Sequence, residues 1–255
     1  MSTPSLRTER LTIRFGGHAA VNGVTCAFRP GELTAIVGPN GAGKTTWFNL
    51  VSGQLAPTEG RIFLGERDIT GLSPSARALA GVGRAFQLTN LFPRLSVLEN
   101  VRLAVQARRR GGGRLLSRAA ADRDTIAEAM RYVERTRLGA VADLPAAALP
   151  HGDQRKLEVA LLLAMEPQVF MFDEPTAGMS VDEAPVILEL IAAIREDRTK
   201  TILLVEHKMD VVRALADRIV VLHNGELVAD GRPDAVMALP IVREIYLGVG
   251  AEEAA

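Results

Sequence analysis

The sequence predicts an α/β fold around a largely parallel sheet, and three features of its pattern indicate this. Short apolar runs that end in turn residues alternate with segments of helical periodicity. Three of the runs, residues 33–37, 169–172 and 201–205, are apolar almost throughout, as expected of strands covered on both faces. A fourth run, 219–222, precedes an Asn224-Gly225 turn. We therefore expect these runs to form the core strands.

The N-terminal region predicts a second kind of strand pairing. The segments LTIRFGG (11–17), VTCAFRPGE (24–32) and EGRIFLGE (59–66) are short strand-like stretches that end in glycine turns. Such stretches are typical of an antiparallel edge to the parallel sheet.

The middle of the chain, residues 88–158, is mostly helical in pattern and is broken by ARRRGGGRLLSR at 107–118. Three glycines among arginines favour a mobile, solvated loop, with binding to an acidic partner as the alternative. We expect one domain over 1–250, with a core of 1–87 and 159–250 and a helical subdomain over 88–158.

Composition excludes several classes of protein. The chain has 255 residues, and its 30 basic and 30 acidic side chains balance, so no global field indicates a nucleic-acid partner. The single cysteine, Cys26, cannot form an internal disulfide and fits a reducing cytosol. The first fifteen residues lack an apolar secretion segment, and no run approaches the ~20 apolar residues that span a bilayer.

The strongest chemical signal is GPNGAGKTT at 38–46, which follows the run LTAIV and precedes a helical segment. Gly38, Gly43, Lys44 and Thr45 fit the pattern G-x-x-x-x-G-K-[ST]. In this pattern the loop N–H groups wrap phosphates, the lysine reaches the β and γ oxygens, and the threonine binds Mg²⁺. The alternative, a plain glycine turn, is disfavoured by the strand-loop-helix context.

The second signal is VFMFDEP at 169–175, an apolar run that ends in two carboxylates. Asp173 falls at the carboxyl edge of the sheet, where ligands of α/β proteins collect. Because side chains alternate along a strand, Glu174 should point differently from Asp173. We expect Asp173 to hold Mg²⁺ through water and Glu174 to polarise the attacking water, the alternative being a surface loop.

The third signal is a helix with an unusual start, ALPHGDQRKLEVALLLAM at 148–165. Leu157, Ala160, Leu161 and Ala164 form an apolar stripe at helical spacing. The free N–H groups at the front of this helix can hold an anion or face water, and the residues alone leave both open.

With these motifs in place, the chain resembles the ATP-binding cassette (ABC) family over nearly its whole length. The resemblance implies a P-loop NTPase core with an inserted helical subdomain, and ATP and Mg²⁺ as cofactors. Phe15 matches the aromatic residue that stacks on adenine, Gln87 matches the glutamine that links Mg²⁺ and water to the transmembrane partner, and His207 matches the switch histidine. Taken singly, a residue such as Phe15, Gln87 or His207 is more often a capping, core or edge residue than a ligand-binding one. The order and spacing of all three along the chain favour the roles that the family assigns.

The resemblance thus assigns a complete set of site residues. The catalytic residues are Glu174 and His207, and the Mg²⁺ ligands are Thr45, Gln87 and Asp173. The ATP contacts are Phe15, Asn40, Gly41, Ala42, Gly43, Lys44, Thr45 and Thr46.

The start of the helix at 149 departs from the family's Leu-Ser-Gly-Gly-Gln signature, which faces the ATP of an opposite subunit. The segment here is Leu149, Pro150, His151, Gly152 and Asp153. Pro150 replaces the serine that bonds the γ-phosphate, and it also lacks an N–H, although proline suits a first helical turn. Asp153 adds a negative charge that disfavours phosphate unless its side chain turns away. Gly178, Met179 and Ser180 replace the family's Ala-Leu-Asp crossing segment.

Two further segments narrow the resemblance within the family. GRAFQLTNLFPRLSVLENVRLAV and the ending PIVREIYLG are similar to ATPases of branched-chain amino acid importers and of related amide and urea importers. This implies an energy-coupling ATPase on the cytoplasmic face of the membrane. Its partners would be transmembrane permease subunits, a second ATPase in a homodimer or heterodimer, and, indirectly, a substrate-binding protein.

Two alternatives remain at this stage. One is a soluble ABC protein that uses ATP closure as a switch, although no coiled coil, second cassette or basic patch supports it. The other, suggested by Pro150, is a nucleotide-binding subunit that hydrolyses poorly, which the presence of Glu174 and His207 disfavours.

Overall fold

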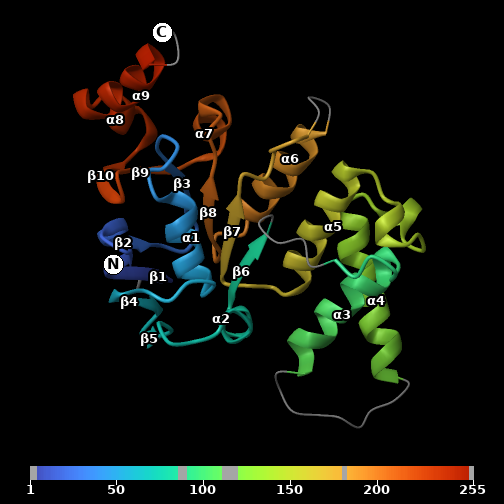
Figure 1. Ribbon diagram of the computed structural model, residues 1–255. Helices are drawn as coiled ribbons and strands as arrows, with labels where there is room; N and C mark the ends of the chain where they lie inside the picture. Colours follow the sequence, from blue (N-terminus) through green and yellow to red (C-terminus); the bar gives the residue numbers. More distant parts are fainter. Residues whose placement is uncertain (1–4, 86–90, 111–119, 180–182, 253–255) are drawn as a thin grey trace.

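A six-stranded sheet in the order β10-β9-β3-β8-β7-β6 forms the centre of the molecule (Figure 1). The computed structural model describes residues 5–85, 91–110, 120–179 and 183–252. The strands of this sheet are β3 (Leu33–Val37), β6 (Val82–Ala85), β7 (Val169–Asp173), β8 (Thr201–Val205), β9 (Arg218–His223) and β10 (Glu226–Gly231). All neighbours are parallel except β10, which runs antiparallel to β9. Every residue of β3, β7 and β8 is buried, which confirms the predicted core strands.

A second, antiparallel sheet in the order β2-β1-β4-β5 lies beside the first. Its strands are β1 (Leu6–Phe15), β2 (His18–Phe28), β4 (Glu59–Leu64) and β5 (Arg67–Asp68). Helix α1 (Lys44–Ser52) packs between the two sheets, where Trp47 and Phe48 belong to an apolar cluster drawn from both. The antiparallel strands predicted from the sequence are therefore present, but they form a separate sheet and not an edge of the parallel one. Helix α1 joins this sheet to the core, because its apolar side chains pack against both.

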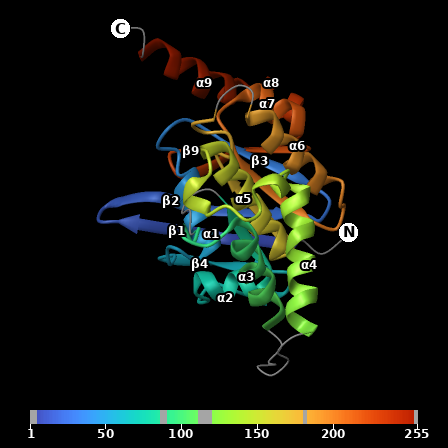
Figure 2. The ribbon, with the colours of Figure 1, turned by 90° about the vertical axis from the view of Figure 1, so that its right-hand side faces the viewer.

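Helices cover the other face of the central sheet and extend beyond its β6 edge (Figures 1 and 2). These helices are α3 (Val97–Arg110), α4 (Ala120–Arg135), α5 (His151–Ala164) and α6 (Ala184–Arg195), with single turns at Gly139–Val141 and Ala146–Ala148. One apolar cluster continues from Phe172 in the sheet through Leu157 of α5 to Val101 of α3 and Val133 of α4. Helix α5 is thus the link between the sheet and the helical region. The domain division at 88–158 stays a prediction.

Helix α3 continues three residues beyond the start of the break expected at 107. Arg108 hydrogen-bonds Glu128 and the Tyr132 hydroxyl of α4, and Arg109 also pairs with Glu128. These ion pairs between helices explain why the arginines stay helical. Residues 111–119, the rest of the predicted loop, lie outside the described residues.

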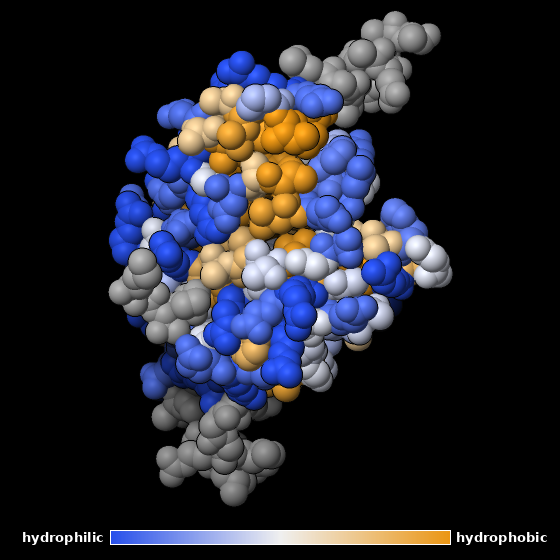
Figure 3. All heavy atoms as spheres, turned by 90° about the vertical axis from the view of Figure 1, so that its left-hand side faces the viewer, coloured by the Kyte–Doolittle hydropathy of each residue, from blue (hydrophilic) through white to orange (hydrophobic). Residues whose placement is uncertain are grey.

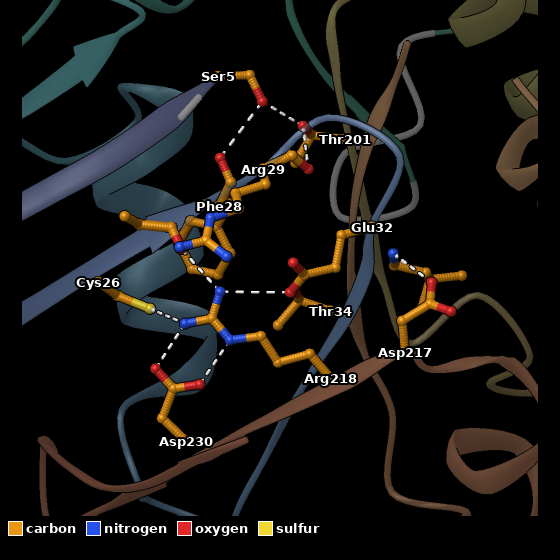
Figure 4. A network of polar contacts seen from close by, with 12 residues as sticks. Ser5, Cys26, Phe28, Arg29, Glu32, Thr34, Thr201, Asp217, Arg218 and Asp230 are labelled. Carbon is orange, nitrogen blue, oxygen red and sulfur yellow. Dashed lines mark hydrogen bonds and ion pairs between the residues drawn. The ribbon is translucent and has the colours of Figure 1, made fainter. Parts of the chain in front are cut away.

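Arg218 at the start of β9 ties the two sheets together (Figure 4). Its guanidinium makes two 2.5 Å hydrogen bonds to Asp230 of β10 and one of 2.7 Å to the Ala27 carbonyl of β2. It also lies 3.3 Å from Glu32 Oε1 and contacts the sulfur of Cys26. Burial raises the pKa of the Cys26 thiol to about 12, so this cysteine is neutral at physiological pH.

The C-terminal helices close the β10 edge. These are α8 (Pro233–Ala238) and α9 (Pro240–Glu252), which come after the β9-β10 pair in the chain. Two other helices complete the described fold: α2 (Pro74–Ala80) comes before β6, and α7 (Met209–Leu215) comes between β8 and β9. Apolar side chains gather in a patch on the side of the molecule that lies at the left of Figure 1 (Figure 3). Leu239 and Ile241, at the junction of α8 and α9, are 39% and 45% exposed. In the part of the chain that the structure describes, no helix is both long and apolar enough to cross a membrane.

Candidate functional site

The predicted phosphate-binding loop, residues 38–43 and called the phosphate loop below, connects the end of β3 to the start of α1. Gly38 and Gly43 have φ values of 148° and 95°, a region that side chains rarely adopt. A Cβ on Gly38 would lie 2.1 Å from the Leu222 carbonyl oxygen, and one on Gly43 would lie 2.4 Å from that of Ala20. The loop is therefore held against β2 and β9, and only glycine fits at these two positions.

Lys44 folds back over this loop. Its ammonium donates to the carbonyl oxygens of Gly38 and Pro39 at 2.7 and 2.8 Å. The residue is 5% exposed, and burial lowers the pKa of Lys44, while Glu174 and Asp173 oppose that change. A buried cation that faces two carboxylates and two carbonyls belongs to the same site as Asp173 and Glu174.

The loop and the start of α1 fit a nucleotide's phosphates. Helix α1 begins at Lys44 without a side-chain cap on its first N–H groups, so an anion can accept from them. Asn40, Gly41 and Thr45 are exposed at the rim, with Ala42 and Lys44 buried beneath. Because an exposed hydroxyl and a carboxylate are hard oxygen donors, Thr45 and Asp173 also fit Mg²⁺, which usually binds few protein ligands besides phosphate.

Asp173 and Glu174 point in different directions, as the sequence predicted. Asp173, the last residue of β7, has its side chain 6% exposed and accepts a 2.5 Å hydrogen bond from Arg84. Burial raises the pKa of Asp173, and Arg84 opposes the rise. Glu174 has a φ of 49°, and its N–H donates to the Val205 carbonyl at 3.0 Å. This left-handed turn directs the Glu174 side chain out of the strand.

Glu174 and His207 are in direct contact. Glu174 Oε1 lies 2.7 Å from His207 Nε2, and the two side chains are 40% and 42% exposed. They follow β7 and β8, which are neighbours in the sheet. The histidine can therefore orient the carboxylate while solvent reaches both.

Glu206 and Arg84, to which the sequence interpretation gave no role, connect the chain segments at this edge of the sheet. Glu206 is 4% exposed; it accepts hydrogen bonds from the Thr176 hydroxyl at 2.6 Å and from the His207 N–H at 2.8 Å. Arg84 reaches Asp173 from β6. The position of Glu206 directly after the apolar run 201–205 could have indicated that it belongs to the site. Nothing in the local sequence indicated that Arg84 would pair with Asp173.

Phe15 and Gln87 stand apart from this set. Phe15 ends β1 at the β1-β2 turn and is 53% exposed, and the same hairpin carries Ala20, whose carbonyl borders the phosphate loop. An exposed ring on the hairpin that borders this loop is free to stack on a base. Gln87 lies outside the described residues.

The signature segment lies at the start of α5. Pro150 is the residue before the helix, with φ −56° and ψ 158°, so it stands just ahead of the first turn that we expected it to occupy. His151 is exposed, and Asp153 turns along the helix to pair with Lys156 at 2.7 Å, away from the helix start.

Gly152 connects this segment to the chain that follows Glu174. A Cβ on Gly152 would lie 2.2 Å from Glu183 Oε1, and one on Gly178 would lie 3.8 Å from His151 Cε1. The helix start therefore lies against Gly178 and the Glu183 side chain, and a larger residue at 152 would have to displace that side chain.

The chain matches the family model described as ABC transporter over residues 21–177. The ATP-binding protein LivG for high-affinity branched-chain amino acid transport is 40% identical in Salmonella typhimurium over 253 residues, which are 97% of this chain and 99% of that protein. BraF from Pseudomonas aeruginosa, with the same printed role, is 39% identical over 254 residues, again 97% and 99% of the two chains.

Solved structures agree with these sequence relatives. A nucleotide-free ATP-binding cassette from an ABC transporter superposes with a TM-score of 0.81 at 28% identity, covering 95% of this chain and 98% of that one. The ADP conformation of an ATP-binding cassette superposes with a TM-score of 0.80 at 28% identity, covering 97% and 100%.

Proposed function

This chain belongs to the ABC transporter family, and we propose that it is the ATP-hydrolysing, energy-coupling subunit of an importer for branched-chain amino acids or related small solutes. The observation that carries the proposal is the Glu174–His207 contact beside the phosphate loop. In this proposal Glu174 is the general base and His207 orients it, close to Lys44 at the start of α1.

We propose the following chemical roles, which rest on the positions of the described side chains and, for Gln87, on the sequence motif alone. Phe15 would stack on adenine, and residues 40–46 with Lys44 would bind the phosphates. Thr45 and Asp173, joined by Gln87, would hold Mg²⁺, which when bound supplies positive charge to the β and γ phosphates. Glu174 would accept the proton of the attacking water, and His207 would keep its carboxylate in place.

A pocket beside β6 is a candidate binding site for the permease. It has a volume of about 490 Å³ and lies between β6, α3 and α5. Its lining includes the large apolar side chains of Leu91, Phe92, Leu103, Leu161 and Met165, together with the polar Arg84, Asn100 and Glu158. Phe92 is 55% exposed at its rim. We infer that a cytoplasmic helix of a permease binds here, and that this contact keeps the protein at the cytoplasmic face of the membrane.

A second cassette is the other expected partner. The helix start at Pro150–Asp153 would face the ATP held by that cassette, and the partner is either a second copy or a related ATPase. Pro150 has no side-chain hydroxyl that could bind the γ-phosphate of the partner's ATP, which favours the alternative of a poorly hydrolysing subunit. The retained Glu174–His207 pair favours an active one.

The test is reconstitution of the chain with its permease in proteoliposomes that contain a substrate-binding protein. We expect ATPase activity that requires the permease and rises several-fold when the binding protein is loaded with leucine, isoleucine or valine. Glu174→Gln should bind ATP and lose turnover, because an amide cannot accept the proton. An ATPase rate that is the same with and without the permease would refute the importer role. An unchanged ATPase rate in Glu174→Gln would refute the role of Glu174 as the general base.

A further inference from the structure

The Mg²⁺ carboxylate, Asp173, is paired with a buried arginine. Arg84 Nη2 lies 2.5 Å from Asp173 Oδ2, and the two side chains are 7% and 6% exposed. The parallel register between β6 and β7 sets Arg84 opposite Met171, two residues before Asp173. The arginine therefore reaches along the sheet edge toward the end of its neighbouring strand.

The other nitrogen of the same guanidinium is anchored to helix α1. Arg84 Nη1 donates to Asn49 Oδ1 at 2.7 Å and to the Ser52 hydroxyl at 2.9 Å, and the group lies 5.5 Å from the Phe48 ring centroid. Helix α1 begins with Lys44 and Thr45, the residues expected to contact the nucleotide and Mg²⁺. One buried cation thus joins the helix of the phosphate loop to the carboxylate expected to face Mg²⁺.

Resting on the function proposed above, we propose that Arg84 is a positioning residue for the Mg²⁺-nucleotide site. It bridges α1 and β7 and holds the Asp173 carboxylate in one orientation before Mg²⁺ arrives. A buried carboxylate needs a partner, and an arginine fork that is itself held by further acceptors, Asn49 and Ser52 among them, can fix both its charge and its direction. Arg84 itself contacts neither Mg²⁺ nor the nucleotide in this role.

A competing role makes the opposite prediction. If Arg84 only neutralised Asp173, it would compete with Mg²⁺ for the carboxylate, and its removal would tighten Mg²⁺ binding. If Arg84 served only stability, its removal would lower the melting temperature and leave the Mg²⁺ requirement unchanged.

The test measures binding of a fluorescent ADP analogue to the full chain, first in excess EDTA and then in a titration with Mg²⁺. For Arg84→Met, which keeps an unbranched apolar stem and removes the charge, we expect the Mg²⁺ concentration for half-maximal enhancement to rise about tenfold. This corresponds to ~1.4 kcal/mol. The affinity in EDTA should change less than twofold. Arg84→Lys, which keeps the charge but cannot hold Asn49, Ser52 and Asp173 together, should give an intermediate value of about threefold.

The control is Arg195→Met, which removes an arginine–aspartate pair, with Asp217, away from this site and should leave the Mg²⁺ titration unchanged. An unchanged or lower Mg²⁺ requirement in both Arg84 variants overturns the proposal. If Arg84→Met does not fold, the Arg84→Lys titration alone decides. Failure of the parent chain to bind nucleotide would instead refute the proposed function, so the two failures are distinguishable.

Discussion

Replacing Pro150 by serine tests whether the start of α5 faces the nucleotide of a second cassette. Pro150 precedes the first helical residue, so its missing N–H is not one of the donors that point out of the helix. The gain from serine is therefore its hydroxyl alone, which can donate to a γ-phosphate while it accepts from the first turn of α5.

The new hydrogen bond sets the size of the effect. A hydrogen bond to a charged group contributes roughly 1.5–3 kcal/mol. The loss of the fixed proline φ costs about 0.4–1 kcal/mol through the unfolded state, and a serine N-cap stabilises α5 by about 1 kcal/mol. Both of these act on the open and closed states alike, so neither changes the free energy of dimerisation. At the lower end of the hydrogen-bond range we expect a gain of ~1.5 kcal/mol per site, or about tenfold.

The assay is ATP-driven dimerisation followed by analytical ultracentrifugation, in a Glu174→Gln background so that hydrolysis does not dissolve the dimer. Pro150→Ser should lower the ATP concentration at half-dimerisation by about tenfold. Gly152→Ala is the packing control, because its Cβ would lie 2.2 Å from Glu183 Oε1. Dimerisation that Gly152→Ala abolishes and Pro150→Ser leaves unchanged would refute the donor argument and leave only a packing role.

Three further predictions address binding and stability. Lys44→Ala should abolish tight MgATP binding by calorimetry, because Lys44 is the buried cation of the loop; unchanged affinity would refute the assignment. Phe15→Ala should weaken ATP and ADP binding by the same factor, since an exposed ring that stacks on adenine does not sense the γ-phosphate; a new preference between the two nucleotides would contradict it. Arg218→Met should lower the free energy of unfolding in urea by about 2 kcal/mol, because it removes a largely buried bidentate ion pair. Arg137→Met, in an exposed pair with Glu189, should change it by less than ~0.5 kcal/mol, and equal losses would refute this account.

Much of the site could be predicted from the sequence because its parts are local. Gly38 and Gly43 occupy positive φ in a loop that one strand and one helix define, and the motif records both. The apolar runs that became β3, β7 and β8 signal burial on both faces by composition alone. The start of α5 was likewise visible from its periodicity.

The contacts between these parts depend on the order of strands in the sheet, which no local pattern specifies. Glu174 meets His207 across 33 residues of sequence because β7 and β8 are neighbours, and Arg84 meets Asp173 across 89 residues because β6 forms the next strand. The close contact between Gly152 and the Glu183 side chain arises in the same way, from another segment of the chain. The sequence by itself therefore determined the glycine loop after β3 and the buried strands that end beside it, through backbone conformation and apolar periodicity. Only the tertiary structure decided which of them touch, because long-range packing of buried strands and helices sets those distances.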